Sequence, residues 1–463
     1  MLQRREQTLD WISQQVYRVV PLSDELQRMK ELFPEQAIME AVRPFYSNDM
    51  GRGSEDPVLL TKTLFLSFFY DVVGDAKTLD TLKNRLDWRL FCDLRLDEDL
   101  FDRTTLVKFR RGVGLVVIET LFQTLLVELV DQGRLDVRHR FFDGTPVKAR
   151  AAINPYRDEV YTETLTAIEE KLQQFRANQI ALDPTLNTSP VELTKTHYAS
   201  DNTAVDARWV QEMIPVGERQ SAGDPEARFQ RGKHGKRSEL GYEVFFSTDS
   251  VQLFIEDVLV SAEASQGQAL FKAKVEQSAP GQQWSVDAEF RTGEIAHAAE
   301  EAEVTLNTPA RTGKAPGKTF PKTEFVYDAD ADTYVCPAQQ TLSHRSTTQK
   351  TGERHYRADR GICAACPYRE DCTTSKTGRT VTRNRYEAEL NRQQEHACTP
   401  EAVMGKVLRG IVAEGKFAEA VRHGLKTMRY VGHEMAVLQS TLVAYILNLK
   451  RLLRVEAQAT ART

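Results

Sequence analysis

The chain has 463 residues, of which 41% are hydrophobic and 27% are charged. This length and composition suffice for two or three domains with hydrophobic cores of their own. Taken alone, the net charge of −5 argues mildly against binding to nucleic acid, because binding to phosphates usually leaves a basic footprint. Basic stretches do occur at 228–237 and from Lys406 to Arg454, and a solvated charged face is the alternative explanation for both.

The sequence predicts a cytoplasmic protein without a membrane segment. The first ten residues, MLQRREQTLD, are charged and show no secretory signal. No apolar run reaches the roughly 18 residues that a membrane span needs. The longest candidate, Val58 to Val73, is interrupted by polar residues and is interpreted as a buried helix.

The first 132 residues are expected to be helical. Asp56-Pro57 is a good helix start, because Asp caps free N–H groups and Pro fits the first helical position. A long helix is expected to open at Thr104-Thr105, with Lys108, Arg110 and Arg111 near its start. A series of short helices that ends with these basic residues near a helix start could bind DNA in helix-turn-helix fashion. The alternative is a helical domain that serves only for packing.

After Gly133 the pattern changes to strands followed by helices. This order fits an α/β core inserted among helical pieces. The expected elements are a strand over 139–147, a helix over 158–175, a polar loop over 180–225, a hairpin over 241–261 that turns at 248–250, a strand over 282–290, a helix over 292–301 and helix over 403–453.

Three carboxylates follow or interrupt apolar segments that lie far apart along the chain. Asp143 stands in FFDGTPVKA, and Asp287 stands in WSVDAEF, just after an apolar strand. Glu414 shares a predicted helix stripe with Phe417, Ala418 and Val421, so it is expected to face the core. Because an unpaired buried charge is costly, each of these acids needs a partner or a metal ion.

Phosphoryl transfer between DNA strands uses two metal ions about 3.5–4 Å apart, and Mg²⁺ accepts carboxylate ligands. The three acids fit such a site. The alternative is chance, because the chain has 66 acidic residues. Asp249 also lies between strands, but turn chemistry explains its position in STDS.

Four of the six cysteines lie close together in the sequence, and they are Cys336, Cys363, Cys366 and Cys372. A cytosolic protein rarely keeps disulfides, so this cluster indicates a metal site. A C-x₂-C pair with two further cysteines fits tetrahedral structural Zn²⁺. The alternatives are free thiols and an iron–sulfur cluster.

Five motifs in order resemble the bacterial insertion-sequence transposases of the DDE superfamily, in the group with a ribonuclease-H-like core and a four-cysteine insert. The resemblance covers most of the chain. The motifs are GRGSEDPVLLTKTLFLSFFYDV with WRLFCDLRLDEDLFDRTTLVKFRR, then FFDGTPVKARA, DPEARFQRGKHGKRSELGYEVFFSTDS, SVDAEFRTGEIA, and RGIVAEGKFAEAVRHGLKTMRYVG followed by LVAYILNLKRLL.

The resemblance implies a multidomain α+β fold. Its expected parts are a helical N-terminal DNA-binding domain (1–132), the first part of a ribonuclease-H-like α/β catalytic core (133–312), a cysteine-rich zinc-binding insert (313–398), a helical C-terminal part of the core that carries the catalytic Glu (399–456) and a tail (457–463).

The resemblance also implies a function and a site. Asp143, Asp287 and Glu414 would be the catalytic residues and would hold two Mg²⁺ or Mn²⁺ ions. The enzyme would cleave double-stranded DNA at the transposon ends with water, and the freed 3′-OH would attack target DNA. A synaptic homodimer at the nucleoid is expected. The expected DNA contacts are Lys148, Arg228, Lys233, Lys236, Arg237, Arg409 and Arg422.

The sequence departs from the family pattern after the Glu. The family usually has a Lys two helical turns later, where this chain has Val421, and Arg422 is one residue out of register. Two rival functions therefore stay open. One is a metal-dependent nuclease of the same fold that does not join strands. The other is an inactive or repurposed transposase-derived protein that only binds DNA.

Overall fold

The structure of the chain is a computed structural model. It describes residues 2–5, 8–20, 22–47, 53–151, 223–230, 239–263, 266–311, 320–349 and 352–460. The predicted helix over 158–175 and most of the predicted loop over 180–225 lie outside the described residues. The chain divides into two compact units: unit 1 combines Met1–Gly267 with Ile411–Thr463, and unit 2 is Gln268–Gly410.

Unit 1 begins with helices, as the sequence predicts. They are α1 (Trp11–Val19), α2 (Asp24–Glu31), α3 (Glu35–Val42), the 3₁₀ turn η1 (Arg43–Phe45), α4 (Pro57–Phe69), α5 (Asp75–Asn84), α6 (Leu86–Phe91), α7 (Arg103–Phe109), the π-helical turn η2 (Arg110–Gly114) and α8 (Leu115–Asp131). The predicted start of α4 is confirmed, because the Asp56 side chain accepts a hydrogen bond from the Val58 N–H and Pro57 takes the first position. The long helix begins at Arg103, and Asp102 caps it.

Helix α4 is buried on nearly every side and carries a buried cation. The Lys62 side chain is 1% exposed, and its Nζ lies 2.5 Å from a Glu35 carboxylate oxygen and 2.8 Å from one of Asp93. Burial lowers the pKa of Lys62, but attraction to Asp93 and Glu35 outweighs burial and leaves that pKa raised. The ammonium group therefore stays charged within the helical core.

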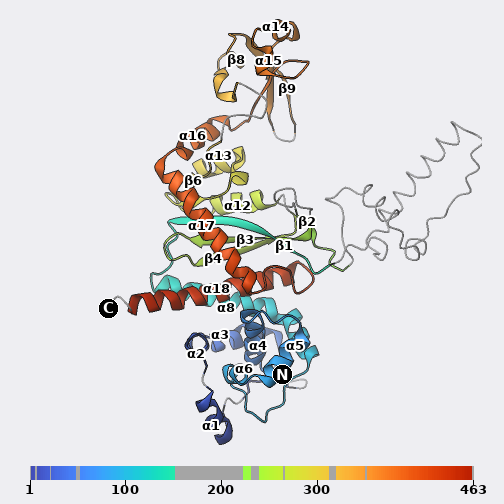
Figure 1. The fold of residues 1–463 in the computed structure, drawn as a ribbon, viewed down its shortest axis with the longest axis vertical. Helices are drawn as coiled ribbons and strands as arrows, with labels where there is room; N and C mark the ends of the chain where they lie inside the picture. The colour runs from blue at the N-terminus through green and yellow to red at the C-terminus, as the bar shows by residue number, and fades with distance from the viewer. Residues whose placement is uncertain are drawn as a thin grey trace, which may run out of the picture. The chain divides into compact units, whose positions relative to one another are not determined.

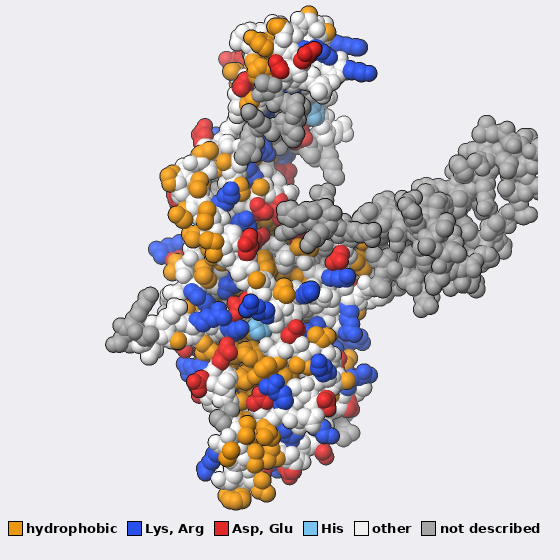
Figure 2. Space-filling view, viewed as in Figure 1, with side chains coloured by type: hydrophobic (Ala, Val, Ile, Leu, Met, Phe, Trp, Pro, Cys, Tyr) orange, Lys and Arg blue, Asp and Glu red, His pale blue; other side chains and the backbone are white. Residues whose placement is uncertain are grey.

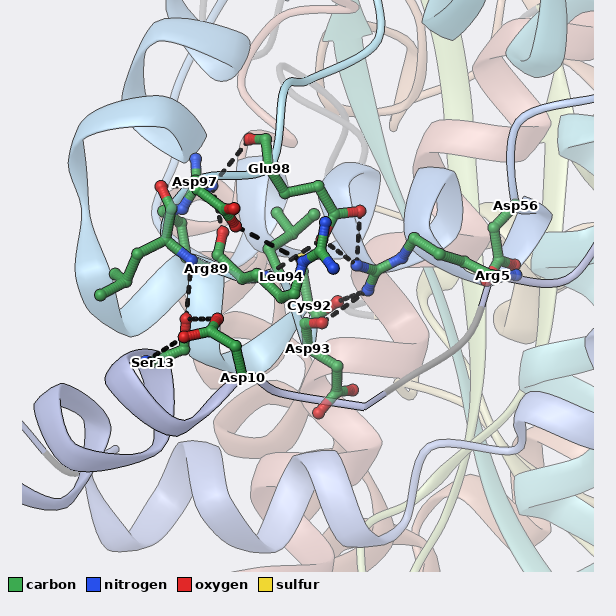
Figure 3. A network of polar contacts seen from close by, with 12 residues as sticks. Arg5, Asp10, Ser13, Asp56, Arg89, Cys92, Asp93, Leu94, Asp97 and Glu98 are labelled. Carbon is green, nitrogen blue, oxygen red and sulfur yellow. Dashed lines mark hydrogen bonds and ion pairs between the residues drawn. The ribbon is translucent and has the colours of Figure 1, made fainter.

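Two arginines fix the loop that follows α6 (Figure 3). The Arg5 guanidinium donates hydrogen bonds to the Glu98 carboxylate and to the carbonyl oxygens of Cys92 and Asp93. Arg89 donates to the carbonyl oxygen of Glu98 at 2.9 Å. These bonds attach the N-terminal segment to a loop almost 90 residues further along the chain.

The helical stretch Arg103–Asp131 is long and apolar enough to cross a membrane by length and composition, with a mean hydropathy of 1.9 over its best window. The expectation that no segment reaches this length was wrong. Half of that window is buried inside the fold, and core helices pass the same test. Its C-terminal part, α8, packs against α3 and against the C-terminal helix α18 (His433–Thr460).

The sheet of unit 1 is antiparallel, and its strands are β1 (His139–Lys148), β2 (Arg228–Gln230), β3 (Glu239–Asp249) and β4 (Ile255–Ser261). β1 pairs with β3 from Arg140↔Asp249 to Lys148↔Gly241, and β4 pairs with β3. The predicted strand over 139–147 and the predicted hairpin of β3 and β4 are confirmed.

The C-terminal region forms two helices, α17 (Pro400–Arg422) and α18, where the sequence predicted continuous helix. Gly424 and Gly432, both at positive φ, frame the break. Helix α18 lies beside α8 and against β4, between the N-terminal helices and the sheet (Figure 1). Its side chains from Leu438 to Leu449 are buried, so it forms the centre of unit 1.

Unit 2 has an α/β part and a separate small sheet. The α/β part contains α12 (Gly267–Glu276), β5 (Gln283–Ser285), the turn η6 (Ala288–Phe290), α13 (Gly293–Glu301) and β6 (Thr305–Asn307), with β5 and β6 parallel. Thr292 caps α13 by accepting from the Ile295 N–H, so the predicted helix is confirmed.

The small sheet of unit 2 is antiparallel, in the order β11-β10-β9-β8-β7. Its core contains Tyr334, Leu342, Tyr356 and Val381. Its strands and the neighbouring helices are η7 (Lys322–Glu324), β7 (Val326–Asp328), β8 (Thr333–Val335), β9 (Thr341–Thr347), β10 (Arg354–Arg357), α14 (Arg360–Ala364), α15 (Arg369–Cys372), β11 (Thr380–Arg383) and α16 (Glu387–Ala397). The chain thus has a mixed α+β fold with a helical N-terminal region.

Gly144 permits close packing in the centre of β1. It lies opposite Phe245 in the strand register, and a Cβ added to it would clash with the Phe245 ring. That ring cannot move aside easily, because it is 1% exposed and stacks on Phe142 with 5.3 Å between ring centroids. The glycine therefore lets two aromatic rings cover the strand next to Asp143.

We predict that Lys62→Met lowers the stability of unit 1 by about 3 kcal/mol, because two carboxylates then lose their buried counter-charge. Calorimetry measures the change. Arg28→Gln is the control, since Arg28 pairs with Glu31 on the surface and its loss costs roughly 0–1 kcal/mol. Equal melting temperatures for the Lys62 variant and the wild type would contradict the prediction.

We predict that Gly144→Ala destabilises the protein by about 1–3 kcal/mol, because the added methyl group overpacks the site. Thermal unfolding measures the loss. The double variant Gly144→Ala/Phe245→Leu should recover part of it by making room for the methyl group. If the single variant is as stable as the wild type, the ring of Phe245 does not confine this position.

Candidate functional site

Asp143 lies in the middle of β1 and is half-buried. Its Oδ1 accepts a hydrogen bond from the Gly144 N–H at 2.9 Å. The preceding side chains, Phe141 and Phe142, are buried and hold the strand in place. The strand position predicted for this carboxylate is confirmed, while its role stays a prediction.

An aromatic contact joins the strand of Asp143 to helix α17. Asp143 and Phe246 are directly opposite each other in the β1–β3 register, so their side chains lie on the same face of the sheet. Phe246 stacks on Phe417 of α17, with 4.9 Å between ring centroids and 14° between planes. Phe417 follows Glu414 by one helical turn. The fold of unit 1 therefore brings α17 to the sheet face that carries Asp143.

The expected orientation of Glu414 was wrong. Glu414 is exposed, as are Ala418 and Val421 of the same predicted stripe. The buried stripe of this part of α17 is formed by Ala413, Lys416 and Ala420. Small alanines face the packed side, and Phe417, between the two stripes, is only partly buried, so the apolar pattern did not identify the core side. An exposed carboxylate needs no buried partner and is accessible to an ion.

The first half of α17 exposes apolar side chains, which gather along this helix (Figure 2). Their exposed fractions run from 40% to 58%, and the residues are Val403, Met404, Val407 and Leu408. Because the bulky apolar residues of α17 are exposed, an apolar stripe on this helix does not mark its core-facing side, and the prediction based on that stripe chose the wrong face.

Asp287 follows β5 and caps the turn η6. Its Oδ1 accepts from the Ala288 N–H at 2.7 Å, and its side chain is 47% exposed. The Nη2 of Arg409 lies 3.8 Å from the same oxygen, and the Arg409 side chain is 13% exposed. Arg409 was expected to contact DNA, and the structure places its charge beside this carboxylate. Phe290 is buried against Phe271.

Within the part of the chain that the structure describes, no group of three or more His, Cys, Asp or Glu side chains is arranged to hold a metal ion. Asp143 and Glu414 belong to unit 1, and Asp287 belongs to unit 2. A common site of the three carboxylates therefore remains a prediction.

Asp249 closes the turn between β3 and β4. Its carboxylate accepts the backbone N–H groups of Val251, Gln252 and Phe254 at 2.6–2.9 Å. Burial raises the pKa of Asp249, although these backbone hydrogen bonds oppose the shift. The hydrogen bonds account for this buried acid as a turn residue, as the sequence indicated.

The four clustered cysteines are unpaired thiols that line one cavity of about 30 Å³. Burial raises the pKa of Cys372, Arg379 opposes this shift, and Cys336, Cys363 and Cys366 add to it. Cys336, Cys363 and Cys372 also pack against the core of the small sheet.

The glycine before Arg379 lies close to one thiol of this cavity. Gly378 has a φ of +96°, and a Cβ added to it would lie 2.9 Å from the Cys363 Sγ. No other residue type fits there easily, because the conformation is left-handed and the thiol is close.

The expected DNA contacts have different environments. Lys148 is exposed at the end of β1, 3.4 Å from a Glu239 oxygen, and Arg422 is exposed at the end of α17. Arg228 donates to the carbonyl oxygens of Pro225 and Ala227. The remaining three, Lys233, Lys236 and Arg237, lie outside the described residues.

Arg110 was considered for DNA contact but is 6% exposed. Its guanidinium lies 2.7 Å from Asp75 and 3.8 Å from the ring centroid of Tyr430. It is therefore a structural residue of unit 1.

Sequence reasoning missed Lys416, two residues after Glu414. Its side chain is 8% exposed, and burial lowers its pKa to about 8. Attraction to Glu419 opposes that shift and repulsion by Arg451 adds to it. A correct assignment of the buried stripe would have found this lysine.

Two family models match the chain: "Transposase domain (DUF772)" over residues 14–112 and "Transposase DDE domain" over residues 335–453. A solved structure, titled "Cryo-EM structure of piggyBac transposase synaptic complex with hairpin DNA (SNHP)", is 10% identical with a TM-score of 0.28. The match covers 94% of this chain and 82% of the chain in that structure. A TM-score this low supports no statement about the fold of this protein. Both matched families are transposase families, and the second contains the segment of Arg409 and Glu414, so the chain is a DNA transposase of the DDE type.

Proposed function

We propose that Asp143, Asp287 and Glu414 together hold two Mg²⁺ or Mn²⁺ ions, with which the transposase cuts the transposon ends and joins them to target DNA. DDE transposases are phosphoryl-transfer enzymes that cleave DNA, and the family normally uses divalent metal ions. The observation that carries the proposal is the Phe246–Phe417 stack, because it brings the helix of Glu414 to the sheet face of Asp143.

The three side chains fit hard cations. They supply carboxylate oxygens, which Mg²⁺ prefers, and Glu414 and Asp287 are accessible to solvent. Two ions would activate the attacking oxygen and stabilise the leaving one. In this proposal Asp143, Asp287 and Glu414 would each supply carboxylate oxygens to the ions. Arg409 balances the charge of Asp287 before an ion binds and is then available to a DNA phosphate.

We extend the proposal to a ribonuclease-H-like core formed by 133–312 and 399–456. Unit 1 supplies the antiparallel strands β4, β3 and β1, and unit 2 supplies the parallel pair β5 and β6 with α13 between them. In such a core, Asp287 would join the other two carboxylates.

We also propose that the four cysteines bind structural Zn²⁺ and that 313–398 is a cysteine-rich insert in the core. The shared cavity and the Gly378 position support a tetrahedral thiolate site. The described side chains do not form a group of three or more ligands, so the thiols would have to move closer together to hold an ion.

A homodimer in the synaptic complex follows from the chemistry proposed, because a transposon has two ends and each must be held at an active site. Double-stranded DNA is the partner, as ends and as target, and the protein would act at the nucleoid in the cytoplasm. A nuclease of the same fold is the rival function. It would cut the ends but would not form the joined product that a transposase forms.

We predict that wild-type protein with Mn²⁺ nicks plasmid DNA carrying the element's own flanks, and that Asp143→Asn, Asp287→Asn and Glu414→Gln each lower this cleavage at least 100-fold. Removing a metal ligand takes away charge stabilisation in the transition state. Glu289→Gln is the control, because Glu289 is exposed two residues after Asp287.

Joined products from a pre-cleaved end support strand transfer, and cleavage without joining supports the nuclease. Full activity in any of the three variants would remove that residue from the site. Tight DNA binding without nicking by the wild type would leave a protein that only binds DNA.

We predict that Cys363→Ser and Gly378→Ala each reduce the zinc content of the purified protein and increase hydrogen exchange over 330–375. The first variant removes a ligand, and the second forces a methyl group toward the Cys363 Sγ. Elemental analysis measures the zinc. Cys398→Ser is the control, since Cys398 is exposed and outside the cavity. Unchanged zinc in both variants would refute the site.

A further inference from the structure

A second pocket of unit 2 lies beside the small sheet and collects positive charge. Its volume is about 290 Å³, and β11, α16 and the residues around η7 contribute to its wall. Its cations are Arg311, Lys322 and Arg379, and its neutral polar groups are Thr380, Thr382 and Asn384. We call it the cationic pocket.

The carboxylates of the pocket do not balance its cations. They are Glu353 and Glu387, against three cationic side chains. Glu387 is engaged twice, because it accepts hydrogen bonds from the Lys322 Nζ and from the Asn384 N–H. The pocket therefore keeps a positive excess in a chain whose net charge is −5.

The cations of the pocket repel one another. Burial lowers the pKa of Lys322, Glu387 opposes this shift, and the charges of Arg311 and Arg383 add to the lowering. Like charges this close are unfavourable unless an anion joins them.

Arg379, which lines this pocket, has buried donors without a partner among the described residues. Its Nη2 donates to the Phe320 carbonyl oxygen at 3.2 Å, and its guanidinium lies 5.5 Å from the Phe325 ring centroid. Its Nε and Nη1 are buried and have no hydrogen-bond partner among the described residues. A buried donor without a partner costs about 1–3 kcal/mol, so an anion that accepted these hydrogen bonds would be favoured.

We propose that the cationic pocket binds a phosphate group of the DNA backbone. A phosphodiester has the charge that the three cations lack and the oxygen acceptors that suit Arg379, Thr380 and Asn384. DNA is the source because the chain is a DNA transposase. The proposal does not depend on the metal ligands, since the pocket residues are distinct from the three carboxylates.

Arg379 gives the pocket a second property. It also lines the cavity of the four cysteines, next to Gly378. The side chain therefore lies against both the thiol cluster and the cationic pocket.

The test is the salt dependence of DNA affinity for the full chain, measured without Mn²⁺ on duplexes with and without the element's end sequence. Each phosphate contact adds about 0.9 to the slope of log affinity against log salt concentration. We expect Arg311→Gln and Lys322→Gln each to reduce the slope by about 1 on both duplexes. Between 50 and 200 mM salt, the loss of affinity for each variant should then be roughly 3–4-fold smaller than the loss for the wild type.

The matched control is Arg392→Gln, whose guanidinium lies 2.6 Å from Glu300 outside the cationic pocket. It should leave the slope unchanged. Arg311 is exposed, so its variant is expected to fold, and circular dichroism with melting temperature checks this for each protein. Folded pocket variants with wild-type slopes would overturn the proposal.

Inorganic phosphate separates the two sources of the anion. If the pocket serves the DNA backbone, the slope changes as stated, and phosphate competes with DNA for wild type but less for Arg311→Gln. If phosphate raises the melting temperature of wild type but not of Arg311→Gln, while the DNA slopes are equal, the pocket takes free phosphate and the DNA assignment fails. Loss of cleavage with unaltered slopes in the variants of Asp143, Asp287 or Glu414 would concern the metal site alone.

Discussion

A buried amide links the C-terminal helix to the sheet, and the rest of unit 1 depends on that link. The Asn448 side chain accepts from the Ile255 N–H at 2.8 Å and donates to the Ile255 carbonyl oxygen at 2.7 Å. Asn448 is fully buried, so leaving either group unpaired would cost a full desolvation penalty. Helix α18 is thereby fixed in depth and rotation against β4 while its other side packs on α8. The helical N-terminal region and the sheet thus share one central helix.

The connection between α17 and α18 transmits this constraint toward Glu414. Gln439 of α18 accepts from the Arg429 N–H and donates to carbonyl oxygens of the connection. The Arg429 guanidinium donates to the Ser67 carbonyl oxygen and to Asp71, beyond the end of α4. The Met428 N–H donates to the Lys148 carbonyl oxygen at the end of β1. The segment that follows the Glu414 helix is therefore bound both to the strand of Asp143 and to the N-terminal helices.

Local signals in the sequence predicted elements of unit 1 and of the α/β part of unit 2, because caps and strand alternation act over a few residues, but they predicted none of the strands of the small sheet. Asp56, Thr292 and the β3–β4 hairpin are examples. The side of α17 that carries Glu414 could not be predicted this way. Its bulky apolar residues are exposed and its alanines are buried, so hydrophobicity pointed to the wrong face. The environment of Lys62 could not be predicted locally either, because its carboxylate partners come from other parts of the chain.

Charge placement connects the two candidate regions of this transposase. Carboxylates that face DNA repel its phosphates, so a site of three acids needs cations before DNA can approach. Arg409 supplies one beside Asp287, and metal ions would supply the others. The chain as a whole is acidic, so a local concentration of positive charge is needed to hold the DNA backbone. The cationic pocket would supply such a concentration. Because Arg379 also lines the thiol cavity, the same side chain would contact both the cysteine cluster and the bound DNA phosphate.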